Sequence, residues 1–222
     1  MDLQEMKDKY AQAAALQKAA STPKIRLAKA IFEELGDYED SEARVTECDR
    51  YLEFSEGSHV LLGSYEGNPV SWLVLDEKGR NRLLFADECL EHMPFNKDRD
   101  YTPWSHSTLR RWLNKDFLEK TFTLQERMAL LLTECDNHSD PRWSIENGQD
   151  TRDKCFIFSA QELDRYLPQP EDRANGDWWW LRGHGFGKLC MQAIYNDGTL
   201  YHIGVNKNSP EIGVRPAVWY RL

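Results

Sequence analysis

Three consecutive tryptophans, Trp178, Trp179 and Trp180, are the feature that most constrains how this chain can fold. Each indole ring must be buried over a large area, and its N–H group must still find a hydrogen-bond acceptor. On a β-strand, successive side chains point to opposite faces, so Trp179 should face away from the other two. The run therefore predicts a strand near the C-terminus, with at least one or two of the three rings in the core.

The charge and cysteine content limit the partners and compartments to consider. The 222 residues include 28 Lys and Arg against 37 Asp and Glu, and the resulting charge of −9 disfavours binding to nucleic acid or anionic membranes. No apolar stretch approaches the roughly 18 residues of a membrane span, and no basic start precedes an apolar run as in a signal peptide. Five scattered cysteines, an odd number, indicate reduced thiols. We therefore expect a cytoplasmic protein without nucleic-acid or membrane partners.

The first 55 residues read as a helical module. Apolar residues recur at helical spacing over residues 3–20, 25–35 and 40–52, with a helix-start signal at Pro23 and a natural stop at Gly36. The stretch 28–41 resembles tetratricopeptide-like helical hairpins. A solenoid of such hairpins needs about three repeats to bury its faces, and little more than one is present here. Two uses stay open for this module: a helical cap that packs on its neighbour or mediates dimerisation, and a peptide-binding groove.

From residue 57 to residue 222 the pattern predicts a mixed α+β domain. Polar, turn-rich residues 136–153 form a loop of the kind that often has a functional role. The sequence Asn196-Asp197-Gly198 is the strongest hairpin turn in the chain. Strands are expected at 59–64, 70–76, 82–85 and 154–159, and helices at 107–113, 123–132 and 160–166.

An ordered series of short motifs resembles a known family. The series comprises Gly63-Ser64-Tyr65, residues 69–76, 104–114, Phe122-Thr123 with Glu126, 151–159 with Glu162, Trp179-Trp180-Leu181-Arg182, and Gly213-Val214-Arg215-Pro216-Ala217. With these motifs the chain resembles a bacterial domain of unknown function, the one numbered 6273. That family is similar in pattern to C-type-lectin-like folds, which include relatives of the formylglycine-generating enzyme and retroelement-diversified variable proteins. The resemblance implies short helices that flank a twisted antiparallel sheet, with the terminal Gly-Val-Arg-Pro on a central strand.

The fold that this resemblance implies occurs in enzymes, sugar binders and protein binders, so the residues must decide between them. Formylglycine-type oxidation uses a cysteine pair close in sequence near the C-terminus, whereas Cys190 stands alone here. The Glu-Pro-Asn and Gln-Pro-Asp tripeptides of calcium-dependent lectins are missing. Asn96 and Asp98 alternate with Asp100 like the start of a calcium loop, but Tyr101 stands where an EF-hand needs Gly.

Other catalytic patterns also fail. The glycine-rich stretch 183–188 has three residues between Gly183 and Gly187 where a phosphate-binding loop needs four, and Leu189 replaces the Ser or Thr that should follow the lysine. We therefore expect a loop there. The six histidines lack the spacing of a zinc site, and no Gly-x-Ser-x-Gly nucleophile motif occurs. The sequence thus predicts no catalytic residue, no metal and no cofactor.

The remaining interpretation is non-enzymatic recognition of a protein or small ligand by the C-terminal aromatic and polar surface. Aromatic anchors mixed with short polar groups are typical of adaptable binding surfaces. The candidate ligand-binding residues are Trp178, Arg182, His184, Tyr195, Tyr201, His202, Asn206 and Asn208. For Arg182 and Arg215, an internal hydrogen-bonding role is the competing interpretation. Two alternatives stay open for the whole chain: a divergent enzyme whose site is assembled only by the fold, and a purely structural interaction module.

Overall fold

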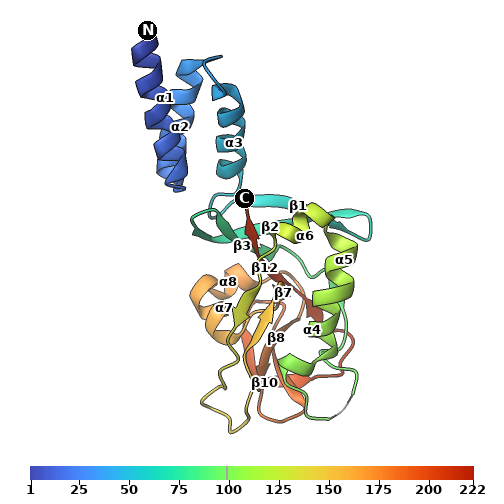
Figure 1. Ribbon diagram of the computed structural model, residues 1–222. Coiled ribbons are helices and arrows are strands. Elements are labelled where there is room, and N and C mark those ends of the chain that lie inside the picture. The colour runs from blue at the N-terminus through green and yellow to red at the C-terminus, as the bar shows by residue number, and fades with distance from the viewer. Residues whose placement is uncertain (99) are drawn as a thin grey trace.

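The computed structural model describes residues 1–98 and 100–222. Figure 1 shows a helical module at one end of a mixed α/β domain. The module consists of α1 (Leu3–Lys18), α2 (Thr22–Leu35) and α3 (Ser41–Glu53), close to the predicted ranges. The Asp2 carboxylate caps α1 by accepting a hydrogen bond from the Glu5 N–H at 2.8 Å. Gly36, with φ of 60°, ends α2. The apolar faces of these helices pack into their own core of Ala13, Ile25, Ala28, Phe32, Leu35, Cys48 and Tyr51.

Tyr51 connects this module to the α/β domain. Its hydroxyl donates to the carbonyls of Ala20 (2.8 Å) and Gly79 (2.9 Å), and the second of these belongs to the turn between β2 (Asn68–Lys78) and β3 (Asn81–Ala86). The guanidinium of Arg82 lies 4.2 Å from the centre of the Tyr51 ring. The helices therefore pack on this turn through a buried aromatic ring and a buried cation.

The first sheet is antiparallel throughout and brings the end of the chain beside its early strands. Three of the predicted strands are confirmed. The strand predicted at 154–159 is shorter, because the carbonyls of Ile157 and Phe158 accept hydrogen bonds from Arg182. The order of the sheet is β1 (His59–Tyr65), β2 (Asn68–Lys78), β3 (Asn81–Ala86), β12 (Ala217–Arg221) and β7 (Cys155–Phe156).

The second sheet contains the candidate recognition strands. Strand β11 runs parallel to β8, whereas the other pairs are antiparallel, so this sheet departs from the purely antiparallel arrangement that the resemblance implies. Gly213 and Val214 form β11, an interior strand. The order is β10 (Leu200–Asn206), β9 (Cys190–Ile194), β8 (Trp179–His184), β11 (Gly213–Val214) and β4 (Glu91–His92). A third, two-stranded sheet pairs β5 (Thr133–Cys135) with β6 (Thr151–Asp153).

Arg215 joins the two large sheets where the chain crosses from β11 to β12. Its Nε donates to the carbonyl of Ala86 at 2.8 Å, and its Nη1 donates to the carbonyl of Arg173 at 2.9 Å. The buried guanidinium lies 4.3 Å from the ring centre of Phe85 and 5.4 Å from that of Trp179. The prediction that Arg215 serves as an internal hydrogen-bond hub is therefore confirmed.

Short helices flank the sheets, with α4 to α6 on one side and α7 and α8 on the other (Figure 1). The capping box of Thr123 and Glu126 starts α6 as the sequence predicts. The prediction that this helix reaches Leu132 is wrong, because the Leu131 N–H donates to the carbonyl of Trp219 in β12. The bounds are η1 (Trp104–His106), α4 (Thr108–Trp112), the π-helical segment η2 (Leu113–Phe117), α5 (Leu118–Thr121), α6 (Leu124–Ala129), α7 (Ala160–Tyr166) and α8 (Pro170–Arg173).

Two of the three consecutive tryptophans lie in the core. Trp179 and Trp180 are fully buried, and their indole N–H groups donate to the carbonyls of Arg173 (3.3 Å) and Met93 (2.9 Å). Trp178 is half-buried. The run is therefore mainly a structural element of β8, with only its first ring accessible to a partner.

Candidate functional site

The predicted recognition residues lie at the start of β8 and along it, on the β9–β10 hairpin and in the turn after β10. Figure 1 shows β10 in the part of the domain away from the helical module. The turn of this hairpin forms at the predicted residues. The Asp197 carboxylate accepts a hydrogen bond from the Thr199 N–H at 2.9 Å, and Gly198 adopts a φ of 85° that favours glycine.

Three of the candidate residues form one aromatic cluster. The ring centres of Trp178 and Tyr195 lie 4.2 Å apart in an edge-to-face arrangement, and those of Tyr195 and Tyr201 lie 4.9 Å apart. All three side chains are half-buried. Because the rings pack on one another, each holds its neighbours in a fixed position while one side stays open to solvent.

Arg182 lies inside the domain, where its guanidinium bonds to the protein itself. Only 1 % of it is exposed. Its guanidinium donates to the carbonyls of Ile157 (2.7 Å) and Asp136 (2.9 Å) and to the side chain of Asn137 (3.1 Å), and it forms an ion pair with Glu162. These contacts support the internal hydrogen-bonding interpretation of Arg182, and contact of this residue with a ligand stays a prediction.

His184 is also buried, although the sequence placed it in a loop. Strand β8 continues to this residue, and its ring stacks on Tyr101 with 5.2 Å between ring centres. The Asn147 side-chain oxygen lies 2.7 Å from the backbone N of His184 and 3.1 Å from its Nδ1, so Nδ1 donates this hydrogen bond. Burial, with the nearby charge of Lys207, lowers the pKa of His184 to about 4.

The stability of the protein should therefore depend on the neutral form of His184. Because the folded-state pKa lies below the ordinary value of about 6.5, the contribution is complete above that pH and is lost as the pH falls towards 4. Between pH 7 and pH 4.5, the wild-type protein should lose roughly 2–3 kcal/mol more unfolding free energy than the His184→Gln variant. Urea unfolding at both pH values measures this difference, with His59→Gln at an exposed histidine as the control. Parallel pH profiles for wild type and His184→Gln would contradict the assignment.

His202 lies at a small polar pocket of about 130 Å³. Asp140 is central there: it pairs with Arg142 at 3.1 Å, accepts a hydrogen bond from Gln192 at 2.8 Å, and lies 3.7 Å from Nδ1 of His202. Arg142 also contacts the His202 ring. Burial and the charge of Arg142 lower the pKa of His202, which favours the neutral form of the ring.

The last two candidates shape the turn that follows β10. The Asn206 side-chain oxygen accepts a hydrogen bond from the Asn208 N–H at 3.3 Å, and the Asn206 carbonyl accepts one from Ser209 at 2.9 Å. Asn206 is exposed and Asn208 is half-buried. Both therefore lie at the surface, with the main effect of fixing the local backbone.

Comparison with family models matches residues 72–222 to DUF6273, a domain of unknown function. The chain belongs to this family. Comparisons with curated proteins and with solved structures gave no match. The DUF6273 match begins at Trp72 inside β2, and it includes the aromatic cluster, the His202 pocket and the whole β9–β10 hairpin.

The DUF6273 domain also exposes apolar side chains that sequence reasoning did not select. Phe186 is 68 % exposed and Ile203 is 52 % exposed, and the Phe186 N–H donates to the Ile203 carbonyl at 2.8 Å. Trp143 packs edge-to-face on Phe186 with 5.6 Å between ring centres. Leu189 and Tyr101 are also exposed. Lys188, the residue before Leu189, places its Nζ 5.9 Å from the centre of the Tyr101 ring, so the two exposed side chains belong to neighbouring segments. These five residues, Tyr101, Trp143, Phe186, Leu189 and Ile203, are called the apolar face below.

A signal for the apolar face was present in the sequence. Phe186 stands between Gly185 and Gly187 in the stretch that superficially resembles a phosphate-binding loop. A large apolar residue flanked by glycines in a turn is poorly placed for burial, because its neighbours have no side chains to cover it. Exposure could have been inferred from that context.

Among residues 1–98 and 100–222, no group of three or more His, Cys, Asp or Glu side chains is arranged to hold a metal ion. None of the helices in the same ranges combines the length and apolar character needed to cross a bilayer.

Proposed function

We propose that this chain is a non-enzymatic recognition module that binds a partner protein through the apolar face and the β9–β10 hairpin beside it. The apolar face is the observation that supports this proposal most strongly. Phe186 and Ile203 expose more than half of their surface while their backbones are hydrogen-bonded to each other, so they form a fixed patch. Contiguous exposed apolar patches are typical of interaction sites on otherwise polar domains.

The neighbouring residues complete a surface of the kind that binds proteins. Tyr195 and Tyr201 present half-buried rings held by Trp178, and His202 adds a neutral hydrogen-bonding group. Rigid aromatic anchors beside short polar groups give contact area at a low cost in side-chain entropy. This composition supports recognition by the surface as a whole.

A protein partner fits this region better than a small ligand. The His202 pocket encloses about 130 Å³, whereas pockets for small organic ligands usually measure about 300–1,000 Å³. The exposed side chains Phe186 and Ile203 protrude beside it, and protruding apolar groups are buried most completely by a complementary protein surface.

The ionisable groups of the region give the enzyme alternative little support. Two carboxylates line the pocket: Asp140 is engaged by Arg142 and Gln192, and Asp164 is largely exposed and pairs with Arg173 at 3.2 Å, so neither is held in the apolar surroundings that prepare a catalytic carboxylate. Burial raises the pKa of Cys135 to about 12 and that of Cys89 to about 11. These thiols therefore stay protonated at neutral pH and are weak nucleophiles.

The proposal also includes a C-type-lectin-like arrangement for residues 57–222, a tetratricopeptide-like character for the helices, and a bacterial, cytoplasmic setting. The interior position of Gly213 and Val214 in β11 supports the first of these. The five free cysteines, at Cys48, Cys89, Cys135, Cys155 and Cys190, support a reducing compartment.

Quantitative affinity capture with surface variants tests the proposal. Phe186→Ser combined with Ile203→Ser should reduce recovery of the partner at least about tenfold, since buried apolar anchors dominate protein interfaces. Both positions are exposed, so the unfolding free energy should change by less than about 0.5 kcal/mol for each. The partner recovered is then confirmed by titration of the purified pair.

The matched control is Leu124→Ser combined with Met128→Ser, which alters exposed apolar residues on α6. This pair should retain the partner. If the Leu124→Ser/Met128→Ser pair lost the partner and the Phe186→Ser/Ile203→Ser pair kept it, the interface would lie on the α6 surface. That result would contradict the proposal. Binding of a small molecule that survives both pairs would argue for the ligand alternative.

A further inference from the structure

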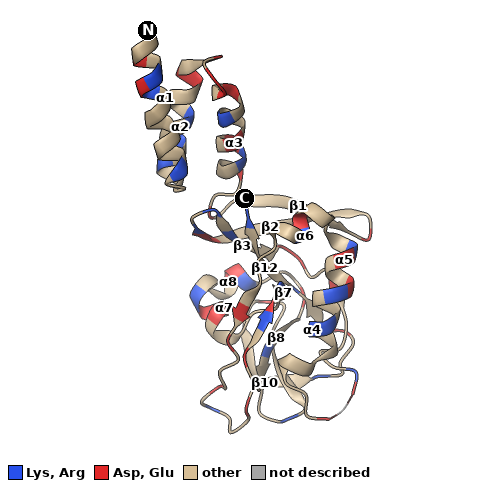
Figure 2. Ribbon diagram, viewed as in Figure 1, with Lys and Arg blue, Asp and Glu red and all other residues tan. Residues whose placement is uncertain are grey.

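A groove with a cavity of about 560 Å³ lies between the segment α4–η2 and residues 152–154, and it is called the basic groove below. It shares no lining residue with the His202 pocket and none with the apolar face. Figure 2 shows basic residues on α4 and near β7. The charged lining of the groove consists of one carboxylate, Asp153, and five Lys and Arg side chains, Arg110, Arg111, Lys115, Arg152 and Lys154.

The floor of the basic groove is a neutral structural unit that fixes its two sides. Arg110 binds Asp153 through Nε at 2.7 Å and through Nη2 at 2.7 Å, so neither charge is available to a partner. The Asn114 side chain accepts a hydrogen bond from the Lys154 N–H at 2.9 Å and donates to the Cys155 carbonyl at 2.8 Å. The helical side and the strand side are therefore held at a set separation before any partner binds.

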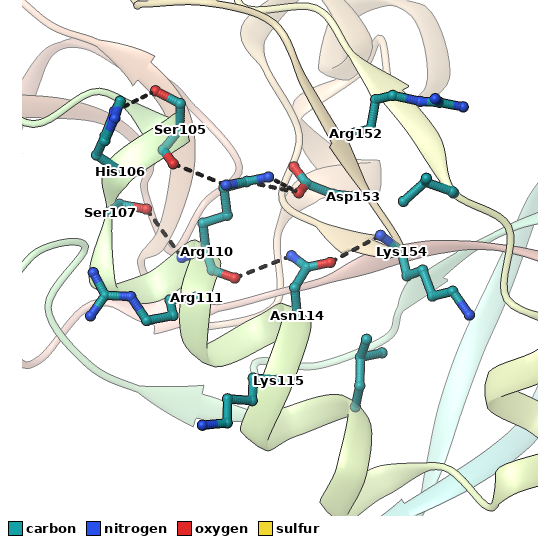
Figure 3. A pocket seen from close by; sticks show the side chains of 12 residues that line it. Ser105, His106, Ser107, Arg110, Arg111, Asn114, Lys115, Arg152, Asp153 and Lys154 are labelled. Carbon is teal, nitrogen blue, oxygen red and sulfur yellow. Dashed lines mark hydrogen bonds and ion pairs between the residues drawn. The ribbon is translucent and has the colours of Figure 1, made fainter.

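The remaining cations lie on the two sides of the groove and point in opposite directions. Figure 3 shows the charged ends of Arg111 and Lys115, on the helical side, directed away from those on the strand side, Arg152 and Lys154. Arg111, Lys115 and Arg152 are exposed and make no ion pair or side-chain hydrogen bond among residues 1–98 and 100–222. Lys154 donates to the carbonyl of Arg127, a neutral acceptor, at 2.7 Å. These cations do not surround one small anion, but a partner long enough to cross the groove would meet both sides.

The neighbouring carboxylates leave the charge of the groove uncompensated. Asp116 and Glu119 follow Lys115 along the helix, and Glu134 lies opposite Arg152 in the β5–β6 pair. None of these three carboxylates lines the groove, and in the described part of the chain none comes within 4.0 Å of a cation on either side. Positive charge is thus concentrated here in a chain whose formal charge is −9.

The basic groove also has an apolar part. Leu118 and Leu132 line it, and Leu132 is 52 % exposed. An exposed leucine among unpaired cations offers a partner a contact that charge alone does not use. The lining therefore matches a partner that combines negative charge with an apolar side chain.

We propose that the basic groove binds an extended, acidic segment of a partner protein, and that an apolar residue of this segment covers Leu132. In an extended chain successive side chains point to opposite sides, so neighbouring acidic residues would reach the helical side and the strand side in turn. The planar fork of each arginine suits a carboxylate. Nucleic acid is a poorer match, because its phosphates offer Leu132 no contact and the charge of −9 repels so dense a polyanion.

Fluorescence anisotropy of labelled peptides with the full chain tests this assignment. The probe is a glutamate-rich peptide with one central leucine, and its affinity should fall as NaCl is added. Replacement of its leucine by serine should weaken binding by about tenfold, as expected for one lost apolar anchor. Replacement of its glutamates by glutamine should abolish binding. Oligothymidylate, the nucleic-acid probe, should bind more weakly than the leucine peptide.

Variants on the two sides of the groove locate the binding. Arg111→Gln combined with Arg152→Gln removes one cation from each side and should weaken binding of the leucine peptide by at least about tenfold. Both side chains are exposed and unpaired, so this pair should fold, which thermal unfolding verifies. Leu132→Ser should weaken binding of the leucine peptide but leave that of the serine peptide nearly unchanged, since the two leucines are coupled only if they touch.

The matched control, Arg26→Gln combined with Arg80→Gln, removes the same charge at exposed positions outside the groove and should leave the affinity unchanged. The Phe186→Ser/Ile203→Ser pair should also bind the leucine peptide normally, so the basic groove and the proposed interface at the apolar face hold or fail separately. Equal weakening in the two arginine pairs would overturn the assignment. Absence of peptide binding at low salt would do the same, as would tighter binding of oligothymidylate than of the leucine peptide.

Discussion

Substitution Arg182→Ala is expected to lower the free energy of unfolding by about 3–5 kcal/mol. This is a large fraction of the roughly 5–15 kcal/mol by which a typical domain is stable. The substitution removes a side chain that connects the start of the polar loop 136–153, the residue after β7 and the first turn of α7, so the effect should extend over the domain core.

The expected size follows from what the substitution leaves behind. Glu162 loses its ion-pair partner, and the carbonyls of Ile157 and Asp136 lose hydrogen bonds of 2.7 Å and 2.9 Å. A buried acceptor without a partner costs about 1–3 kcal/mol, because it has lost its hydrogen bonds to water and gains none in the protein. The truncated side chain also leaves a cavity in a region where Arg182 is 1 % exposed.

A double variant separates the charge effect from the packing effect. Glu162→Gln keeps the acceptor that caps α7 through the Ser159 N–H, but it removes the carboxylate charge. Combined with Arg182→Met, it should cost less than the sum of the two single substitutions, since no unpaired charge is then buried. Urea unfolding measures all variants. The control is Arg142→Ala, which removes a largely exposed arginine and leaves Asp140 its hydrogen bond from Gln192, so it should cost below about 1 kcal/mol. A loss for Arg182→Ala as small as that of the control would contradict the hub assignment.

Short-range signals in the sequence predict most of the local structure. The capping box of Thr123 and Glu126 and the turn at Gly198 form as expected, because the interacting groups lie within three residues of one another in the sequence. The end of α6 was mispredicted for the opposite reason. Leu131 is apolar and compatible with helix, but its N–H bonds to Trp219, which a local pattern cannot reveal.

The candidate site was predictable only in part. The aromatic cluster of Trp178, Tyr195 and Tyr201 brings together residues that the sequence had grouped by composition. Burial of Arg182 was not decided by its neighbours in sequence, since its partners come from three separate segments. The exposure of Ile203 depends on the irregular pairing of β10 with β9 between Tyr201 and Val205, which turns the side chain outward.

The cavity of about 560 Å³ that lies between the segment α4–η2 and residues 152–154 shows the same limit more clearly. The sequence motif that contains Arg111 indicates family membership, and the segment that contains Arg152 indicates a loop followed by a strand. The two segments become neighbours through the side chain of Asn114, so the concentration of charge arises from tertiary packing.

Substitution Gly198→Ala is expected to destabilise the protein by about 3 kcal/mol or more. Gly198 adopts a φ of 85°, where any Cβ is strained. A Cβ at this position would also lie 1.8 Å from the carbonyl oxygen of Pro170 and 3.0 Å from the Ala174 N. Both atoms belong to the backbone around α8, so a side-chain rotation cannot relieve the contact.

Gly67→Ala is the matched control, because Gly67 has a nearly identical φ of 83° and a Cβ there would meet no atom of a surrounding residue within 4 Å. It should cost only the conformational strain, about 1 kcal/mol. The difference between the two variants in urea unfolding therefore measures how firmly α8 packs on the β9–β10 hairpin. If the two losses were equal, the hairpin would be free to move away from α8, and the aromatic cluster built on it would not be the rigid surface that protein recognition requires.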